Sequence, residues 1–268
     1  MAASLAGRKV LVVGASAGIG RSIAMRAISD GADVLVAARR ADRLDQLVAE
    51  AGGGTSLVVD VSRGDQAARM TDAVSALGGL DLVVYSVGSA PLRLIANTVP
   101  EDWDAVMRTN VVGFNEVVRA VLPHLSPTSV VAALSSEIVD HPRAALAAYA
   151  ASKAALEVSI RAWRTEHPGR RFCCIRVGAT VPTEFGDAFD GDVLRQVVDR
   201  WVMQGLVQEE FMATDDVAAV LVDTLAVLLA HPGVAIEDLV LRSPSPVVGS
   251  ARPAIANARA AESPGGGG

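Results

Sequence analysis

The chain has 268 residues and is 51% hydrophobic but only 4% aromatic, so its core has to be built from aliphatic side chains. A net charge of −6 without a basic run argues against nucleic acid or an anionic membrane surface as the main partner. Two adjacent cysteines, Cys173 and Cys174, are too few for a disulfide framework and indicate a reducing compartment. In a strand they would point to opposite faces, so we expect neither a redox pair nor a metal site.

The longest apolar stretch, 217–230, is too short to cross a bilayer and contains Asp223, so it predicts a buried helix. No stretch resembles a targeting signal. We therefore expect a cytoplasmic protein without a membrane span.

Short β-branched runs alternate with longer helical patterns along the chain. The runs are continuously apolar, which is typical of parallel strands buried on both faces. Thr214, followed by two acidic residues, is predicted to be the N-cap of the last helix. The β-α-β rhythm predicts one doubly wound parallel sheet of about seven strands with helices on both faces. The expected strands are 9–13, 33–38, 56–59, 80–86, 129–134, 171–177 and 238–241, and the expected helices are 19–30, 42–51, 65–77, 101–122, 148–166 and 215–230.

No linker divides this pattern, so residues 1–242 are predicted to form a single domain. Residues 182–210 are longer than a crossover requires and predict a mobile lid over a substrate. Residues 243–268 are rich in Pro, Ala, Ser and Gly, and this tail is predicted to be partly disordered.

The stretch LVVGASAGIG, directly after the first predicted strand, allows two interpretations. Gly14, Ser16 and Gly18 fit the G-x-S-x-G elbow of a serine hydrolase, but no earlier strand precedes them to supply an oxyanion hole. The four histidines, at positions 124, 141, 167 and 231, fit solvated loop residues better than a catalytic base. Gly14, Gly18 and Gly20 alternatively form a turn that lets a dinucleotide pyrophosphate approach the backbone and a helix N-terminus. The dinucleotide-binding interpretation accounts for more residues of this stretch than the hydrolase interpretation does.

The segment YAASK places Tyr149 and Lys153 four residues apart, on one face of a predicted helix. The chain contains only two lysines among its 24 cationic residues, and only two tyrosines. A chain that otherwise uses arginine keeps a lysine where a compact ammonium matters. This pair therefore indicates catalysis.

These motifs together resemble the short-chain dehydrogenase/reductase family of the Ser-Tyr-Lys type, up to about residue 242. The resemblance rests on the G-x-x-x-G-x-G spacing and on the segments GLDLVVYSVG, EDWDAVMRTNVVG, LSSEIVDHPRAALAAYAASKAAL and ATDDVA. It implies a Rossmann-like dinucleotide-binding and catalytic domain over residues 1–242. It also implies an NAD(P)-dependent oxidoreductase that interconverts a small-molecule ketone, or a 3-oxoacyl-type carbonyl, and a secondary alcohol.

The resemblance implies a role for each residue of the site. Tyr149 would be the acid/base, and Lys153 together with the oxidised nicotinamide would lower its pKa from the usual value near 10. Ser136, 13 residues earlier, would hold the substrate oxygen, and Asn110 would relay protons through water to Lys153. The residues expected to contact the cofactor are Gly14, Ser16, Gly18, Ile19, Gly20, Arg39, Arg40, Asp60, Val61, Ser86, Val87, Gly88, Val181 and Thr183.

NADP(H) is predicted in preference to NAD(H). Ala38 stands where relatives that use NAD usually carry Asp, and Arg39 and Arg40 follow it. Guanidinium groups match the geometry of a 2′-phosphate.

Three segments depart from the family pattern. Residues 85–88 read Tyr-Ser-Val-Gly instead of Asn-Asn-Ala-Gly, and Gly178-Ala179 replaces Pro-Gly. Glu137 and Asp140 place two carboxylates beside Ser136, where they either shape the pocket, select a positive or hydrogen-bond-donating substrate, or are simply solvated.

The alternative function is a nucleotide-binding regulatory or assembly protein with little turnover, and retention of Asn110, Ser136, Tyr149 and Lys153 argues against it. The resemblance further implies a homodimer or homotetramer, paired through the helices at 101–122 and 148–166.

Overall fold

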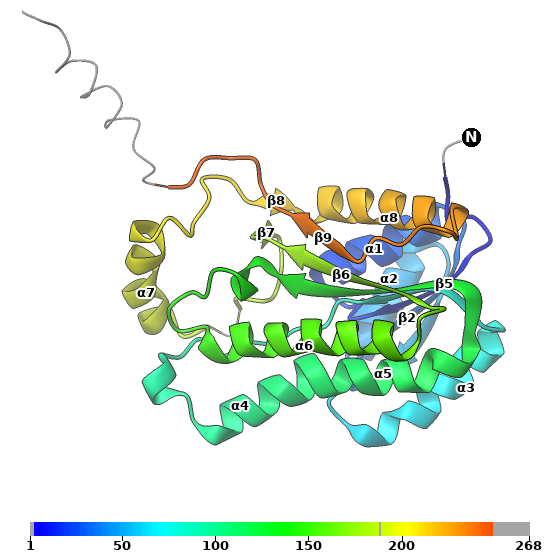
Figure 1. The fold of residues 1–268 in the computed structure, drawn as a ribbon, viewed down its shortest axis with the longest axis horizontal. Coiled ribbons are helices and arrows are strands. Elements are labelled where there is room, and N and C mark those ends of the chain that lie inside the picture. The colour runs from blue at the N-terminus through cyan, green and yellow to red at the C-terminus, as the bar shows by residue number, and fades with distance from the viewer. Residues whose placement is uncertain (1–2, 188, 249–268) are drawn as a thin grey trace, which may run out of the picture.

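The computed structural model describes residues 3–187 and 189–248, and within them seven parallel strands form one central sheet. The strand order β3-β2-β1-β4-β5-β6-β9 reverses direction beside β1, as in a doubly wound sheet (Figure 1). The strands are β1 (Lys9–Val13), β2 (Asp33–Ala38), β3 (Thr55–Val58), β4 (Leu80–Tyr85), β5 (Leu125–Ser136), β6 (Arg171–Val177) and β9 (Asp238–Leu241). The predicted fold class is confirmed.

Helices cover both faces of the sheet (Figure 1). One layer contains α1 (Gly18–Ser29), α2 (Ala41–Ala51) and α8 (Thr214–Ala230). The other contains α3 (Ala67–Leu77), α5 (Gly113–Val121) and α6 (Ala147–Glu166), with α4 (Pro100–Met107) leading into α5. Each layer follows from right-handed β-α-β crossovers.

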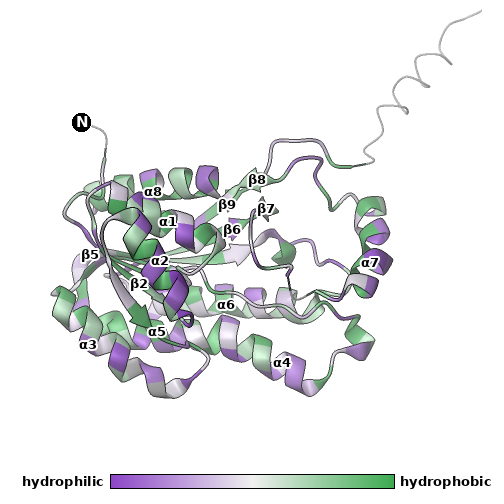
Figure 2. Cartoon of the chain, turned by 180° about the vertical axis from the view of Figure 1, so that it is seen from behind, coloured by the Kyte–Doolittle hydropathy of each residue, from purple (hydrophilic) through white to green (hydrophobic). Residues whose placement is uncertain are grey.

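Alternate residues of each strand enter the two cores, because successive side chains of a strand point to opposite faces. Val10 and Val12 of β1 pack under α1 and α8, whereas Leu11 and Val13 pack under α5. Cys173 and Cys174 divide between the two cores in the same way, as predicted, and both are free thiols. Figure 2 shows the resulting hydrophobic sheet and the hydrophilic residues that recur along the helices.

Two predictions of local structure are wrong. The stretch 101–122 is not one α-helix, because Arg108–Val112 form a π-helical turn between α4 and α5. Thr214 is the first residue of α8 and is buried without a capping bond, since Ala213 takes the N-cap position. Ala213 is fixed there by a short strand, β8 (Met212–Ala213), which pairs with β7 (Thr180–Val181).

Strand β5 is also longer than predicted at both ends, running from Leu125 to Ser136. Its extra residues at the carboxyl end extend the pairing with β6 as far as Ser136 and Val177. This pairing fixes the backbone of Ser136 at the edge of the sheet.

The predicted lid at 182–210 contains one helix, α7 (Gly191–Met203), which stands apart from the two helical layers (Figure 1). Its residue Val197 belongs to a third hydrophobic cluster together with Leu146 and Tyr149 of the α6 region. Phe185 and Phe189 of the same segment pack against this cluster. The lid segment is therefore folded over the start of α6.

The first residues of the predicted tail are attached to the lid segment. The Val248 N–H donates to the Val207 carbonyl at 2.7 Å, and the Glu209 N–H donates to the Pro246 carbonyl at 2.9 Å. The remainder of the tail, 249–268, lies outside the described residues. Within the described part of the chain, no helix is both long and apolar enough to cross a membrane.

Candidate active site

A cavity of about 1130 Å³ opens at the carboxyl edge of the sheet, where β1 and β4 lie side by side and the strand order reverses. Gly14 follows β1 and Ser86 follows β4, and the Ser86 N–H donates to the Val13 carbonyl at 2.8 Å. Doubly wound sheets bind their ligands at this switch point. The cavity is therefore the candidate active site.

The glycine loop is shaped by close backbone contacts. Gly14 has φ +90°, and a Cβ added there would lie 2.8 Å from the Ser86 carbonyl oxygen. A Cβ on Gly20 would overlap the carbonyl oxygen of Gly14, so the start of α1 packs directly on the loop. Gly18 has φ +52° beside Thr183. These positions require glycine, and they leave the N-terminus of α1 open to an anion.

Most of the predicted site residues line this cavity. Gly20 does not, because it has the packing role just described, and Asn110 does not, because it is fully buried. Those that line it are Gly14, Ser16, Gly18, Ile19, Arg39, Arg40, Asp60, Val61, Ser86, Val87, Gly88, Ser136, Tyr149, Lys153, Val181 and Thr183.

Ser136, Tyr149 and Lys153 meet where α6 passes the end of β5. The hydroxyl of Ser136 lies close enough to the Tyr149 phenol to act on its pKa, which it lowers. The Lys153 ammonium lies 5.8 Å from the centre of the Tyr149 ring and donates to the Leu134 carbonyl at 2.8 Å. The (i, i+4) spacing on α6 places both side chains on one helix face, and the backbone of β5 anchors the ammonium.

Burial shifts both titrating groups of this trio away from their charged forms. It raises the pKa of Tyr149 to about 12, although the hydroxyl of Ser136 and the positive charge of Arg143 act in the opposite direction. It lowers the pKa of Lys153 to about 8. In the protein by itself the phenol pKa is thus raised, whereas the sequence analysis expects it to be lowered once the oxidised cofactor contributes its charge.

Asn110 sits in the π-helical turn and links two segments behind the cavity. Its amide oxygen accepts from the Ser89 N–H at 2.9 Å, and its amide nitrogen donates to the Ser89 carbonyl at 3.0 Å and to Ser152 Oγ at 2.8 Å. In this conformation it braces the loop after β4 against α6. No direct hydrogen bond joins it to Lys153 among the described residues.

Ser135, the neighbour of Ser136, is hydrogen-bonded to a buried ion pair. It donates to Glu157 at 2.7 Å, and Arg176 donates to both carboxylate oxygens at 2.8 and 2.6 Å. Despite burial, the bonds from Arg176 and Ser135 lower the pKa of Glu157. This network fixes α6 against β6.

Arg40 connects the glycine loop with the lid segment. It donates to Ser16 Oγ at 2.9 Å and pairs with Glu184 at 2.7 Å. Arg43, which the sequence analysis did not single out, lies 3.7 Å from the other oxygen of Glu184. Arg39 is exposed at the rim of the cavity. The predicted 2′-phosphate site is therefore a cluster of arginines with one carboxylate facing it.

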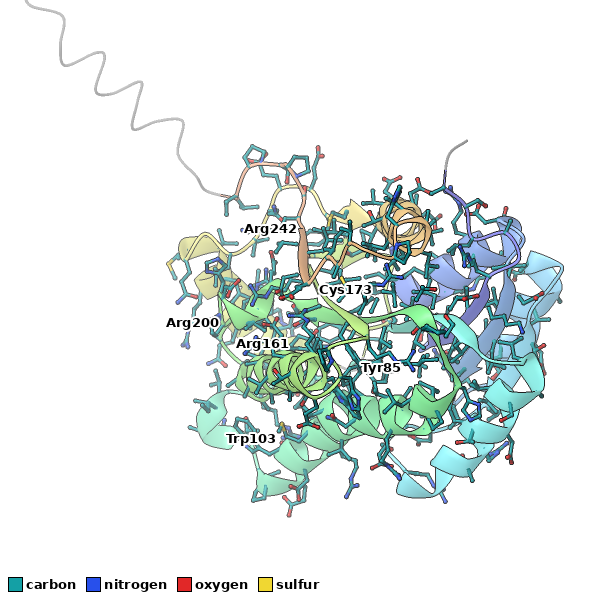
Figure 3. The ribbon with its side chains drawn as sticks, turned by 45° about the vertical axis from the view of Figure 1, so that its right-hand side comes forward. Tyr85, Trp103, Arg161, Cys173, Arg200 and Arg242 are labelled. Atoms are coloured by element: carbon teal, nitrogen blue, oxygen red, sulfur yellow. The ribbon has the colours of Figure 1, made fainter. Side chains whose placement is uncertain are left out.

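Two of the three departures from the family pattern have a structural explanation. Tyr85 is fully buried, donates to the Thr109 carbonyl at 2.8 Å and packs edge-on against Phe114 at 5.4 Å (Figure 3). Burial raises the pKa of Tyr85, so its phenol stays neutral and structural. Gly178 lies beside Glu137: an added Cβ would approach that carboxylate to 3.1 Å.

The two carboxylates beside Ser136 do not line the cavity. Asp140 pairs with Arg176 at 3.0 Å. Glu137 is buried and pairs with Arg143 and, at 2.9 Å, with Arg242. Neither carboxylate is thus placed to meet a substrate directly.

The aromatic wall and the cation of this cavity are not among the residues predicted from the sequence. The Phe185 ring lies 4.9 Å from the ring of Tyr149, and Arg143 lines the cavity beside it. The available signal was weak, since it consisted of two phenylalanines within the segment marked as a lid and an arginine seven residues after Ser136.

The hydrolase interpretation has no support in the geometry. Ser16 Oγ accepts a hydrogen bond from Arg40, and no described histidine bonds to it. A serine nucleophile requires a neighbouring base. The described residues also contain no cluster of three potential metal ligands.

Fold and cavity together define a doubly wound α/β protein with a glycine-lined crevice for a nucleotide. A family model described as "short chain dehydrogenase" matches residues 8–193. The chain belongs to the short chain dehydrogenase family, as the resemblance of its motifs predicts.

Relatives with dehydrogenase or reductase names agree with this assignment. The chain is 37% identical to the short-chain dehydrogenase/reductase FrzI of Cladobotryum sp over 61% of this chain and 66% of that protein. It is 33% identical to glucose 1-dehydrogenase of Gluconobacter oxydans over 66% of this chain and 69% of that protein. A third relative, a short chain dehydrogenase of Pseudocercospora fijiensis, is matched over only 52% of its length. The matched segments thus span between about half and two thirds of these curated relatives.

A solved short chain dehydrogenase from Burkholderia cenocepacia, in complex with NADP, has a similar fold. It superimposes with a TM-score of 0.76 at 25% identity, covering 89% of this chain and 98% of that one.

Proposed function

We propose that this protein is an NADP(H)-dependent oxidoreductase that interconverts a small-molecule ketone and a secondary alcohol. The observation that carries the proposal is the meeting of Ser136, Tyr149 and Lys153 in the same cavity as the glycine loop. The glycine loop and the Tyr149 hydroxyl, as the proposed proton donor, therefore line the same cavity. The dehydrogenase and reductase names of the relatives support the same reaction type.

When bound, the dinucleotide would donate a hydride to the carbonyl carbon during reduction and accept one from the alcohol carbon during oxidation. Ser136 and Tyr149 hold the carbonyl oxygen, and Tyr149 donates its proton to that oxygen during reduction or accepts one during oxidation. Lys153 stabilises the resulting phenolate by its charge, in a site where burial strengthens electrostatic effects. Asn110 holds the loop after β4 against α6 and so positions Lys153 through the helix that carries it.

The residues of the cavity fit a phosphorylated dinucleotide. The φ values of Gly14 and Gly18 and the close packing of Gly20 leave space for a pyrophosphate at the start of α1. Arg39, Arg40 and Arg43 provide positive charge where a 2′-phosphate would lie. Several related structures are described as NADP complexes, which supports the same preference.

Cofactor binding and catalysis are tested together. NADPH and NADH fluorescence is titrated with wild type, the double variant R39A/R40A and Tyr149→Phe. We expect NADPH to bind more tightly than NADH and the double variant to lose at least 10-fold in NADPH affinity. Tyr149→Phe should bind NADPH normally but reduce ketones at least 10²-fold more slowly.

The outcomes of these binding and turnover measurements lead to different conclusions. Failure of wild type to bind either dinucleotide would overturn the proposal. Tight binding without turnover of any ketone would favour the alternative, a regulatory nucleotide-binding protein. A tenfold preference for NADH would refute the cofactor assignment alone.

The assembly and location are part of the proposal. Val112 and Val158 are exposed on the helical segments where family members are expected to pair, which favours a homodimer or homotetramer. Two free thiols on opposite faces of one strand favour a reducing compartment, the cytoplasm.

A further inference from the structure

The wall of the cavity beyond Ser136 and Tyr149 is apolar, with Arg143 as a cation within it. The apolar wall is formed by Ile138, Leu146, Phe185, Phe189, Trp201 and Phe211. Arg143 lines the cavity together with Ser136 and Tyr149. A guanidinium in an apolar surface needs a partner of opposite charge or an acceptor.

Two acceptors of the protein itself bind the Arg143 guanidinium. Nη2 of Arg143 donates to Glu137 and, at 2.9 Å, to the Leu206 carbonyl. The Glu137 side chain is only 6% exposed, and Arg242, labelled in Figure 3, pairs with its other oxygen. Two arginines thus share one carboxylate, and the group of three retains one net positive charge.

Arg143 has donors left over. A guanidinium carries five N–H groups, and both hydrogen bonds described above use Nη2. Among the described residues, Nε and Nη1 of Arg143 have no acceptor. The Arg143 side chain is 17% exposed. Its positive charge acts to lower the pKa of the Tyr149 phenol, against the larger effect of burial. The guanidinium is therefore oriented by Glu137 and still able to bind a further acceptor at the cavity.

We propose that Arg143 is the specificity residue of this site and that the substrate is a keto acid with an apolar body. The carboxylate of the substrate pairs with Arg143, the apolar body packs against the aromatic wall, and the carbonyl lies between Ser136 and Tyr149. This inference rests on the proposed function and specifies its substrate. It also departs from one of the alternatives left open by the sequence, that the carboxylates beside Ser136 select a positive or hydrogen-bond-donating group, because Glu137 pairs with Arg143 instead.

The test compares acids with their esters. The probes are benzoylformate, 3-benzoylpropionate and 5-oxo-5-phenylpentanoate, which vary the distance from ketone to carboxylate, each against its methyl ester with NADPH. For at least one chain length, wild type should prefer the acid over its ester by about 100-fold in kcat/KM. Arg143→Met should abolish this preference by slowing the acid far more than the ester.

Control variants separate charge recognition from folding. Arg143→Lys keeps a cation and should retain part of the preference, whereas the double variant E137Q/R143M, which leaves the net charge of the protein unchanged, should lose it. Arg200→Met changes an exposed arginine of α7 outside the cavity lining and should behave as wild type. Equal losses for acid and ester in Arg143→Met would show that this arginine only fastens the lid, and would overturn the inference.

A binding measurement keeps the inference independent of turnover. Calorimetric titration of 4-phenylbutanoate into the NADP⁺-saturated protein should give at least 10-fold weaker binding for Arg143→Met than for wild type. Unchanged affinity would contradict the role of Arg143. Failure of wild type to bind NADP⁺ or NADPH would instead contradict the proposed function, so the two failures are distinguishable.

Discussion

Lys153 illustrates how one buried side chain would couple its proposed catalytic role to the stability of the fold. It is 3% exposed, and desolvation lowers its pKa to about 8. The nearby Cys174 and Glu157 act in the opposite direction, yet burial dominates. The protein thus keeps a lysine that is costly to charge, in a position where a charge would stabilise the phenolate of Tyr149.

We expect this cost to appear in the pH dependence of folding. Between pH 8 and 10.5 the unfolded chain keeps the proton on Lys153 that the folded chain has lost, so the free energy of unfolding rises with pH. Relative to Lys153→Met, wild type should gain roughly 2 kcal/mol between pH 8 and 10. Urea denaturation of both proteins measures this difference. Parallel curves would show that Lys153 titrates near its ordinary value.

The segment before α7 is the element that connects the parts of the site. Three consecutive residues have separate contacts: Thr183 lies against Gly18, Glu184 pairs with Arg40 and Arg43, and Phe185 covers the ring of Tyr149. The segment therefore reaches from the glycine loop to Tyr149. Glu184 pairs with two arginines proposed to bind a 2′-phosphate, so in the proposed complex with NADPH this carboxylate would have to be displaced.

Removing that competition should strengthen NADPH binding. The ion pairs are partly exposed and so are worth little individually. We expect Glu184→Gln to lower the Kd of NADPH by about 3- to 10-fold at low ionic strength and to leave that of NADH unchanged. Fluorescence titration with Glu184→Asp as the matched control measures this effect. Equal changes for both dinucleotides would mean that Glu184 does not compete with the 2′-phosphate.

At the scale of the whole molecule, the outer surface of the layer formed by α4–α6 carries exposed apolar side chains among the described residues. Val158 of α6 is 57% exposed, and Val112 at the start of α5 is 37% exposed. Exposed valines on neighbouring helices are typical of a surface that another copy covers. The same α6 carries Tyr149 and Lys153 on its buried face. Assembly through this surface would therefore brace the helix that carries Tyr149 and Lys153.

We expect wild type to sediment as a dimer or tetramer at micromolar concentration, and Val158→Asp to shift it to a smaller species. A buried, unpaired carboxylate destabilises an apolar interface. Val234→Asp, at a 55% exposed position after α8, is the matched control and should leave the assembly unchanged. A wild-type monomer at this concentration would contradict the expected pairing.

Comparison of sequence and structure shows which features are locally encoded. The apolar runs predict every strand of the central sheet, although Leu125 and Ser136 lie beyond the predicted ends of β5. The π-helical turn around Asn110 is not predictable in this way, because the hydrogen bonds of its side chain go to Ser89 and Ser152 in other segments. Periodicity reports which face is buried, and it does not report which distant group a polar side chain will bind.

The sequence by itself determined the doubly wound sheet, the glycine loop and the Tyr149–Lys153 pair, because each depends on local periodicity, turn chemistry or helical spacing. Only the tertiary structure decided that Glu137 holds Arg143 with Arg242, and that Glu184 faces Arg40 and Arg43. These partners come from segments far apart in the chain. An ion pair is selected by proximity after folding, so residue type and spacing cannot specify it in advance.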